Sequence, residues 1–359
     1  MTSIFAYKPV YQEGDPGNGI GGYNLKNPVD LSFAFDYNST GKLDHIVLYR
    51  PGTGTIWILH NWRGKFTPVY QEGEPGNGIG GFNLKNPADR IFPFDYDHSG
   101  RADHLVCYRP GTGTCWILKN HRGKWSPVYH EGEPGNGIGG YNLMNPIDQG
   151  FAFDYNGSGK LDHLVWYRPG TGTVWILKNE RGNFSPVYQM GEPGVGIGGY
   201  NLANPIDKGF AFDYDGSGKL DHLVWYRAGT GTIWILKNNR GKFFPVYQMG
   251  EPGIGIGGYN LANPIDKVIA FDWDGSGKLD ELVLWRAGTG TIWILQRQGG
   301  NNWVPVYHQG EPGLGIGGYD LRSPADLVFA FDYRQRRTPN HLCLYRPGTG
   351  TFWILERQF

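Results

Sequence analysis

Cysteine is scarce in this chain of 359 residues, which contains only three. A small, odd number of thiols excludes a disulfide framework and is typical of proteins from a reducing compartment. An excess of charge of one sign is absent as well, because 33 Lys and Arg balance 33 Asp and Glu. Without a basic field the protein lacks the main attraction for a phosphate backbone. We therefore expect no nucleic-acid partner.

Long hydrophobic runs are also missing. No stretch approaches the ~20 apolar residues that a membrane-spanning helix requires, and the first residues, MTSIFAYK, lack the basic and apolar regions of a secretory signal. The sequence therefore predicts no membrane insertion and a protein that is cytoplasmic or is released without a signal peptide. No window shows the apolar stripe and caps of a helix, so the expected helix content is close to zero.

Glycine, proline and aromatic residues are abundant, with 58 Gly, 24 Pro, 13 Trp, 22 Tyr and 19 Phe. Disordered chains carry far less aromatic area, so this chain is predicted to be folded and rich in turns. The motif GTGTxWIL recurs along the whole chain. Its tryptophans lie 59 or 60 residues apart, at positions 57, 116, 175, 234, 293 and 353. The sequence thus predicts one domain, residues 1–359, made of six repeats.

Each repeat contains four short runs of aromatic and β-branched residues bounded by Gly, Pro or Asp. In the fourth repeat they are residues 209–213, 222–227, 232–237 and 242–248. Such runs are typical of an antiparallel meander. Six four-stranded meanders at this period indicate an all-β, six-bladed β-propeller.

The two ends of the chain complete one blade in this prediction. Residues 352–359, FWILERQF, read as a third strand that no fourth strand follows. Residues 5–11, FAYKPVY, read as a fourth strand that no earlier strand precedes. We expect the N-terminal strand to complete the last blade and close the ring, because an unpaired strand edge is a liability.

An Asp-rich turn, D-Y-[DN]-x-[ST]-G-[KR]-x-D, follows the first strand of most repeats. Its spacing lets hard oxygen atoms converge on a Ca²⁺ ion. Three repeats carry the full set of predicted metal ligands: Asp95, Asp97 and Asp103; Asp213, Asp215 and Asp221; and Asp272, Asp274 and Asp280. Asn38 and Asn156 weaken two other sets, and Arg334 and Asn340 are expected to abolish the sixth. The alternative is a metal-free turn whose Asp and Ser side chains cap their own backbone amides.

These turns, with the HLVWYR and WILKNNRGKF segments that follow them, resemble FG-GAP (integrin-like) propeller repeats. Among such proteins the chain is most similar to fungal N-acetylglucosamine-binding lectins of the Psathyrella velutina and Agrocybe type. The resemblance covers all six repeats and implies a propeller fold, Ca²⁺ at some Asp-rich turns and terminal sugars as ligands. Two features depart from the family pattern: Ser replaces the usual central Asp of the turn, and YRPG replaces GFG after the second strand.

A long, nearly invariant loop joins each repeat to the next and covers residues 13–30 in the first repeat. Long loops without strands of their own usually carry function. We expect it to lie over the groove between blades and to place an aromatic ring, an amide or acid, and a guanidinium together. An aromatic ring for stacking, together with directional polar groups for hydrogen bonds, suits the binding of a monosaccharide. The predicted sugar-binding residues are Tyr23, Asn24, Arg50, Phe82, Asn83, Arg109, Tyr141, Asn142, Arg168, Tyr200, Asn201, Arg227, Tyr259, Asn260, Arg286, Tyr319, Asp320 and Arg346.

A structural role for part of this set is the alternative. The arginines can instead pair with an acid at the end of each long loop and hold the ring together. These acids are Asp30, Asp89, Asp148, Asp207, Asp266 and Asp326. The Trp-Ile-Leu segment of each repeat is assigned to the core, because alternate residues of a middle strand fill the space between packed sheets.

The long loops also differ between the two halves of the chain. The first three repeats carry a Glu followed by an Asn, as at Glu13 and Asn18, whereas Val195, Ile254 and Leu314 occupy the Asn position in the last three. If these positions line the grooves, the apolar half should favour a sugar with a methyl-bearing substituent.

An enzyme needs one asymmetric group of matched acids, bases or nucleophiles, whereas this chain repeats its polar groups six times. We therefore expect no catalysis and no required cofactor. A multivalent lectin for N-acetylglucosamine-type or related terminal sugars of glycans uses the repetition best, because several weak sites on one face gain avidity. The alternative is a non-catalytic protein-interaction scaffold, such as an adhesin or the targeting part of a toxin.

Overall fold

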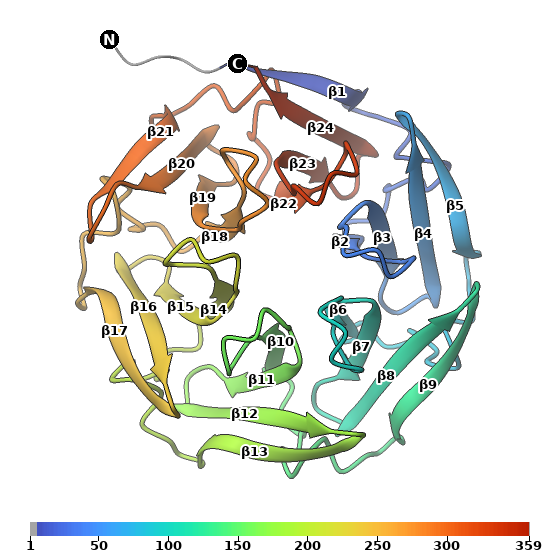
Figure 1. Cartoon of the computed structure of the whole chain (residues 1–359). Helices are drawn as coiled ribbons and strands as arrows, with labels where there is room; N and C mark the ends of the chain where they lie inside the picture. Colours follow the sequence, from blue (N-terminus) through green and yellow to red (C-terminus); the bar gives the residue numbers. More distant parts are fainter. Residues whose placement is uncertain (1–5, 359) are drawn as a thin grey trace.

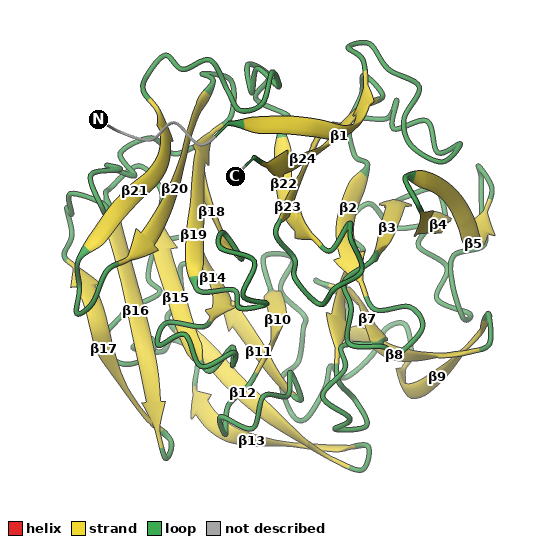
Figure 2. Ribbon diagram, turned by 45° about the horizontal axis from the view of Figure 1, so that its top comes forward, coloured by secondary structure: helices red, strands yellow, loops and turns green. Residues whose placement is uncertain are grey.

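The computed structural model describes residues 6–358, which form 24 β-strands and no helix. Within these residues no helix is long and apolar enough to cross a membrane. Six four-stranded antiparallel sheets surround a central axis, as Figure 1 shows. Only strands and loops are drawn in the tilted view of Figure 2. The predicted all-β, six-bladed propeller is confirmed.

The blades follow the chain in order. The first comprises β2 (Leu31–Phe35), β3 (His45–Arg50), β4 (Thr55–Trp62) and β5 (Lys65–Glu72), and the second β6 (Arg90–Phe94), β7 (His104–Arg109), β8 (Thr114–His121) and β9 (Lys124–Glu131). The third comprises β10 (Gln149–Phe153), β11 (His163–Arg168), β12 (Thr173–Glu180) and β13 (Asn183–Met190). The fourth comprises β14 (Asp207–Phe212), β15 (His222–Arg227), β16 (Thr232–Asn239) and β17 (Lys242–Met249). The fifth comprises β18 (Asp266–Phe271), β19 (Glu281–Arg286), β20 (Thr291–Arg297) and β21 (Trp303–Gln309).

The sixth blade is assembled from both ends of the chain. Strands β22 (Leu327–Phe331), β23 (His341–Arg346) and β24 (Thr351–Arg357) come from the last repeat, and β1 (Tyr7–Glu13) pairs with the outer edge of β24. The antiparallel register runs from Tyr7 opposite Arg357 to Glu13 opposite Phe352. The indole of Trp353 also donates a hydrogen bond to the Glu13 carbonyl, 2.8 Å away. The predicted closure is confirmed.

The hydrophobic core lies between neighbouring blades. One cluster packs Val283 and Ile292 of the fifth blade against Leu342 and Leu344 of the sixth, and comparable clusters fill the other interfaces. The second strand of every blade is buried along its whole length. Burying apolar area between sheets is the main stabilising contribution to such a ring. The three cysteines are free and buried, in agreement with a packing role.

The long loops bridge adjacent blades. In the loop between β1 and β2, the Gly17 amide donates to the Thr349 carbonyl (2.9 Å) of the sixth blade. At Gly22, an added Cβ would lie 3.3 Å from the Trp57 ring of the first blade. Glycine is required at Gly19, where φ is +82° and a Cβ would lie 1.7 Å from the Tyr23 carbonyl oxygen. The loops therefore cover the grooves between blades, as predicted.

Candidate functional site

An arginine at the end of each second strand organises the face that carries the long loops. In the fourth blade, Arg227 Nε and Nη2 donate to the two carboxylate oxygens of Asp207, at 2.8 and 2.9 Å. Nη2 also donates to Asn201 Oδ1 (2.8 Å), and Nη1 forms an ion pair with Glu251. Because Arg227 is buried and four of its five donors are used, its guanidinium is a structural group. The structure thus supports the structural alternative for the arginines, and a sugar contact through the remaining donor stays a prediction.

The same pairing recurs in every blade. Each buried arginine donates through Nε, at 2.7 or 2.8 Å, to the acid at the end of the long loop. The pairs are Arg50 with Asp30, Arg109 with Asp89, Arg168 with Asp148, Arg227 with Asp207, Arg286 with Asp266 and Arg346 with Asp326. In the fifth blade, the hydrogen bonds that Arg286 donates to Asp266 raise the pKa of Arg286. The guanidinium therefore stays charged.

The aromatic ring of the long loop is interior. Tyr200 is 3 % exposed, its hydroxyl donates to Asp207 Oδ1 (2.7 Å), and its ring lies 5.7 Å from the Arg227 guanidinium carbon. Burial raises the pKa of this phenol well above its usual range. The Tyr200 ring therefore offers little of its face to a ligand, and its predicted sugar contact stays a prediction. The other rings of the column are equally buried: Tyr23, Phe82, Tyr141, Tyr259 and Tyr319.

The amide beside that ring is at the surface. Asn201 is exposed, and its Oδ1 accepts hydrogen bonds from Arg227 and from the Ala203 amide (3.1 Å). Both bonds fix the orientation of the side chain and point its NH₂ group away from the network. The arrangement is shared by Asn24, Asn83, Asn142 and Asn260. In the sixth blade Asp320 takes the same place and accepts from Arg346 at 2.6 Å.

A partly exposed tryptophan supplies the aromatic surface that the prediction placed elsewhere. Trp234 packs edge-on against Tyr200 with ring centroids 5.8 Å apart, and its indole donates to the Met249 carbonyl (2.9 Å). Ile235 and Leu236 beside it are fully buried. The core assignment of this segment is therefore confirmed for Ile and Leu, whereas Trp234 packs against the core and keeps part of its ring exposed. The equivalent partly exposed rings are Trp57, Trp116, Trp175, Trp293 and Trp353.

An acid that the sequence analysis did not single out completes the site. Glu251 pairs with Arg227 through one carboxylate oxygen, and its side chain is 44 % exposed. The equivalent acids are Asp15, Glu74, Glu133, Glu192 and Glu311. Each follows a glycine and precedes a proline, which is the signal that identifies the column in the sequence. The predicted amide and arginine thus lie beside two further groups: a tryptophan of the third strand and an acid of the next long loop.

These groups line a shallow pocket in the fifth blade. Its volume is about 100 Å³. The lining includes Asn260, Arg286, Trp293 and Glu311, with Gly258 and Tyr259. An indole surface, an oriented amide donor and a carboxylate acceptor are the groups that bind hydroxylated rings. The geometry fits a small polar ligand.

On the opposite face, the first Asp of every Asp-rich turn caps its own backbone. Asp213 accepts from the Ser217 amide (2.9 Å) and the Gly218 amide (2.7 Å). The equivalent residues Asp36, Asp95, Asp154, Asp272 and Asp332 accept the same kind of bond. The cap forms even in the sixth repeat, whose turn carries arginines. These bonds use both oxygens of the carboxylate that the prediction assigned as the first metal ligand.

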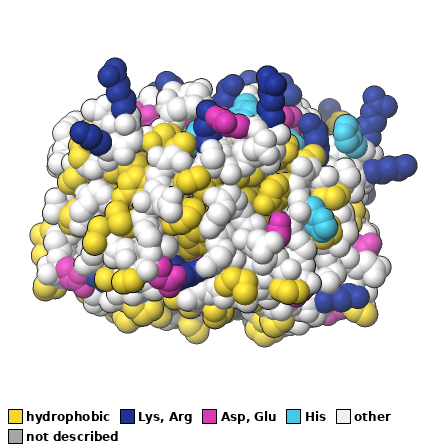
Figure 3. Space-filling view, turned by 90° about the horizontal axis from the view of Figure 1, so that it is seen from below, with side chains coloured by type: hydrophobic (Ala, Val, Ile, Leu, Met, Phe, Trp, Pro, Cys, Tyr) yellow, Lys and Arg dark blue, Asp and Glu magenta, His cyan; other side chains and the backbone are white. Residues whose placement is uncertain are grey.

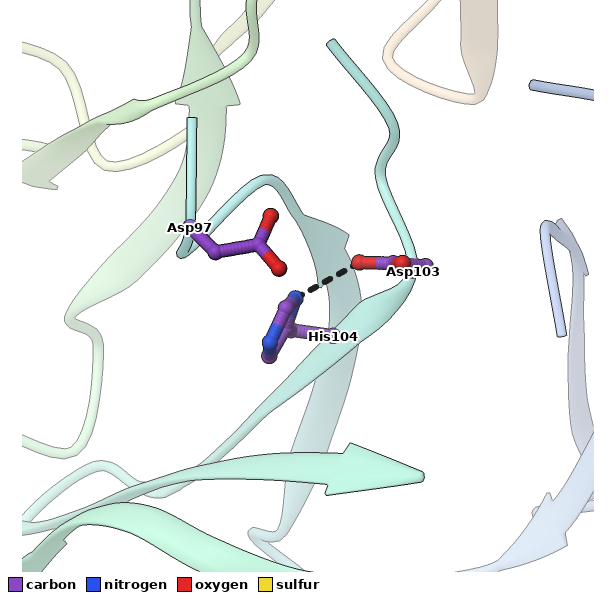
Figure 4. Close-up of side chains that lie close together, drawn as sticks. All are labelled: Asp97, Asp103 and His104. Carbon is purple, nitrogen blue, oxygen red and sulfur yellow. Dashed lines mark ion pairs between the residues drawn. The ribbon is translucent and has the colours of Figure 1, made fainter. Parts of the chain in front are cut away.

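Three clusters of ionisable side chains lie beside the turns. In the second blade the donor atoms of Asp97, Asp103 and His104 lie within 4.8 Å of one another, as Figure 4 shows. His104 Nδ1 is 2.7 Å from Asp103 Oδ1, and Lys119 Nζ is 3.0 Å from Asp97 Oδ2. The fourth blade repeats the cluster with Asp215, Asp221 and His222. A lysine therefore already balances part of the negative charge in these two blades.

The fifth blade carries the oxygen-only version of the cluster. Asp272, Asp274 and Glu281 converge there within the same distance, and Glu281 replaces both the histidine and the predicted ligand Asp280. Gln296 takes the place of the lysine and donates to Glu281 Oε1 (3.0 Å). Burial raises the pKa of Asp272 to about 6, and burial together with the Asp280 charge raises the pKa of Glu281 to about 8. Of the three clusters, this donor set fits Ca²⁺ best.

Comparisons with known proteins identify the fold. No family model and no curated protein matches the chain. Among solved structures, it is similar to an Agrocybe aegerita lectin that recognises non-reducing terminal N-acetylglucosamine. Their TM-score is 0.52 and their identity 19 %, and the match covers 94 % of this chain and 81 % of the lectin. It is also similar to a putative phosphatase from Bacteroides thetaiotaomicron, with a TM-score of 0.54, 10 % identity, and coverage of 99 % and 78 %. At these identities the likeness extends to the fold.

Proposed function

We propose that the protein is a non-catalytic, multivalent lectin whose sugar sites lie on the long-loop face. The observation that supports it best is the repeated arrangement of a partly exposed tryptophan, an oriented amide or acid and a half-exposed acid, which lines a pocket in the fifth blade. In the fifth blade these are Trp293, Asn260 and Glu311. Carbohydrate rings bind through their C–H faces and through directed hydrogen bonds. Six copies on one rigid face would give avidity toward clustered glycans.

The structural similarity to a lectin that recognises terminal N-acetylglucosamine supports the choice of ligand. We propose N-acetylglucosamine or a related terminal sugar as the monosaccharide. The repetition of all polar groups also favours binding over catalysis. The chain's relationship to FG-GAP repeats remains a prediction.

The amide column offers a direct test, because the sixth blade already carries an acid there. Asn260→Asp should remove the NH₂ donor without unfolding the blade, since Asp320 forms the same bond to its arginine. In calorimetric titration with N-acetylglucosamine, we expect the Asn201→Asp, Asn260→Asp double variant to lose two sites. Asp320→Asn should strengthen the binding of N-acetylglucosamine at the site of the sixth blade.

Asn239→Asp is the control for the single variant Asn260→Asp, because it adds the same charge on an exposed turn of the opposite face. Its titration should match that of the parent. Unchanged binding by the double variant would refute the assigned pocket. A parent protein that binds no sugar on a glycan array would refute the lectin and favour the protein-interaction scaffold.

We further propose that Ca²⁺ binds in the fifth blade through Asp272, Asp274 and Glu281. The support is the convergence of three carboxylates with no lysine among them. Added Ca²⁺ should raise the melting temperature of the parent. Glu281→His, which copies the second and fourth blades, should remove most of that increase, whereas His222→Gln should leave it intact. No increase in the parent would contradict the site.

A further inference from the structure

A second pocket lies on the turn face, where the sixth blade meets the first. We call it the seam pocket, and it is lined by Trp62, Arg63, Gly64, Tyr333, Arg334 and Gln335. Its volume is about 380 Å³, which is within the usual range for small-ligand sites. The long-loop pockets described above contribute none of these residues.

Hydrogen bonds between the two blades hold the seam pocket in shape. The side chain of Asn61 donates to the Tyr333 carbonyl (2.8 Å) and accepts from the Gly64 amide (2.8 Å). The amide of Gln335 in turn donates to the Asn61 carbonyl (2.5 Å). The walls are therefore fixed before any ligand arrives, which lowers the entropic cost of binding.

The walls combine aromatic rings with guanidinium groups. Trp62 is 62 % exposed, and the guanidinium carbon of Arg63 lies 5.7 Å from the centre of its ring. Arg334 lies at the same distance from the Tyr333 ring and is held by Glu356 through two bonds of 3.0 and 2.9 Å. Arg63 forms no ion pair with any residue in 6–358. Its charge is therefore available to a ligand.

The equivalent pocket between the third and fourth blades shows what is special about the seam. That pocket, of about 290 Å³, is lined by Tyr155, Asn156, Gly157, Asp221, Asn238 and Arg240. Asparagine stands there in place of Arg334, and Asn239 stands in place of Trp62. An acidic side chain, Asp221, also faces the cavity. The same backbone arrangement thus carries one arginine opposed by an aspartate in one place, and two arginines beside two aromatic rings in the other.

We propose that the seam pocket binds an anionic saccharide, with the sugar ring on Trp62 and a sulfate or carboxylate group on Arg63. An exposed indole offers a flat apolar surface to a pyranose C–H face. A guanidinium with free donors binds planar or tetrahedral oxyanions through paired hydrogen bonds. The turn also carries Arg336 and Arg337 close by in the sequence, which adds positive charge near the pocket. The site is independent of the long-loop pockets.

The test uses the full chain labelled with 5-fluorotryptophan, with the Trp62 resonance assigned by its loss in Trp62→Phe. Galactose 6-sulfate and glucuronic acid should shift this resonance in a saturable way, whereas galactose and glucose should not. Arg63→Gln should lower the affinity about tenfold, as expected for the loss of a charge-assisted hydrogen bond. Higher ionic strength should weaken the parent complex.

Arg240→Gln is the matched control, because it removes the same group from the equivalent pocket. It should leave the affinity for galactose 6-sulfate unchanged. N-acetylglucosamine titrations of all variants should also stay unchanged, which separates this site from the lectin pockets. An unmoved Trp62 resonance, equal shifts with neutral sugars, or a response to adenosine monophosphate alone would each overturn the proposal.

Discussion

The two faces of the ring repeat the same backbone six times but treat variation differently. On the long-loop face, every blade contains the buried arginine, its aspartate partner and the aromatic ring beneath them. On the turn face, the third position of the Asp-rich turn is Asn38, Asp97, Asn156, Asp215, Asp274 or Arg334. The first face thus holds a network that the fold requires, and the second presents side chains free to differ.

Burial explains the contrast. Arg227 and Asp207 are 3 % and 0 % exposed, so removing one partner would leave a charge in the interior without compensation. Asp215 and Lys237 on the other face are about two-fifths exposed, and water can replace either partner. In Figure 3 most basic side chains lie along one rim, whereas apolar side chains cover the middle of the view and the opposite rim.

The largest effect is expected from breaking the buried network. Asp207→Ala should lower the free energy of unfolding by about 3–5 kcal/mol, because Arg227 then keeps its charge without a buried partner. Asp215→Ala, on the turn face, should change it by less than about 1 kcal/mol. Urea unfolding followed by tryptophan fluorescence measures both. Equal losses in the two variants would show that the faces do not differ in this way.

A smaller, pH-dependent effect should distinguish the fifth blade from the second and fourth. The pKa of Glu281 is about 8 in the folded protein and near ~4.3 in an unfolded chain. The folded state therefore binds the proton more tightly, and stability should fall as the pH rises from about 4 to about 8. Glu281→Gln should recover on the order of 3 kcal/mol at pH 8 and little at pH 4.

Thermal melts in chelator, recorded across this pH range, make the comparison. His222→Gln in the fourth blade serves as the control, since it does not carry the carboxyl. A parent whose melting temperature is flat between pH 5 and pH 8 would contradict the raised pKa of Glu281.

The smallest effect concerns the two halves of the long-loop face. Glu13 accepts hydrogen bonds from the amide and side chain of Asn18, both at 3.0 Å, whereas Val195, Ile254 and Leu314 are 72–76 % exposed at the same loop position. Replacing these three by Asn should lower the affinity for an acetamido sugar about fourfold at three sites, since a buried methylene contributes about 0.8 kcal/mol. Calorimetry of parent and variant with N-acetylglucosamine tests it. Six indistinguishable sugar sites in the parent would exclude the existence of two classes of site.

Periodicity was enough to predict the ring, its blades and its closure, because each depends on the spacing of short apolar runs. The orientation of individual aromatic rings was harder. Tyr200 and Trp234 pack against each other, and the tyrosine is the buried ring of the pair. Spacing alone does not reveal which of the two rings is buried. The first Asp of each turn caps its own backbone amides, as the metal-free alternative predicts, and its role as a metal ligand stays a prediction.

The closing strand also determines how the ring would respond to a pulling force. Tyr7 and Arg357 lie opposite each other at one end of the antiparallel pair of β1 and β24. A force applied between these two residues would act across the ladder and break its hydrogen bonds one pair at a time, from Tyr7 toward Glu13. Such unzipping needs less force than shearing all pairs together. The sixth blade is therefore where the propeller would open under tension.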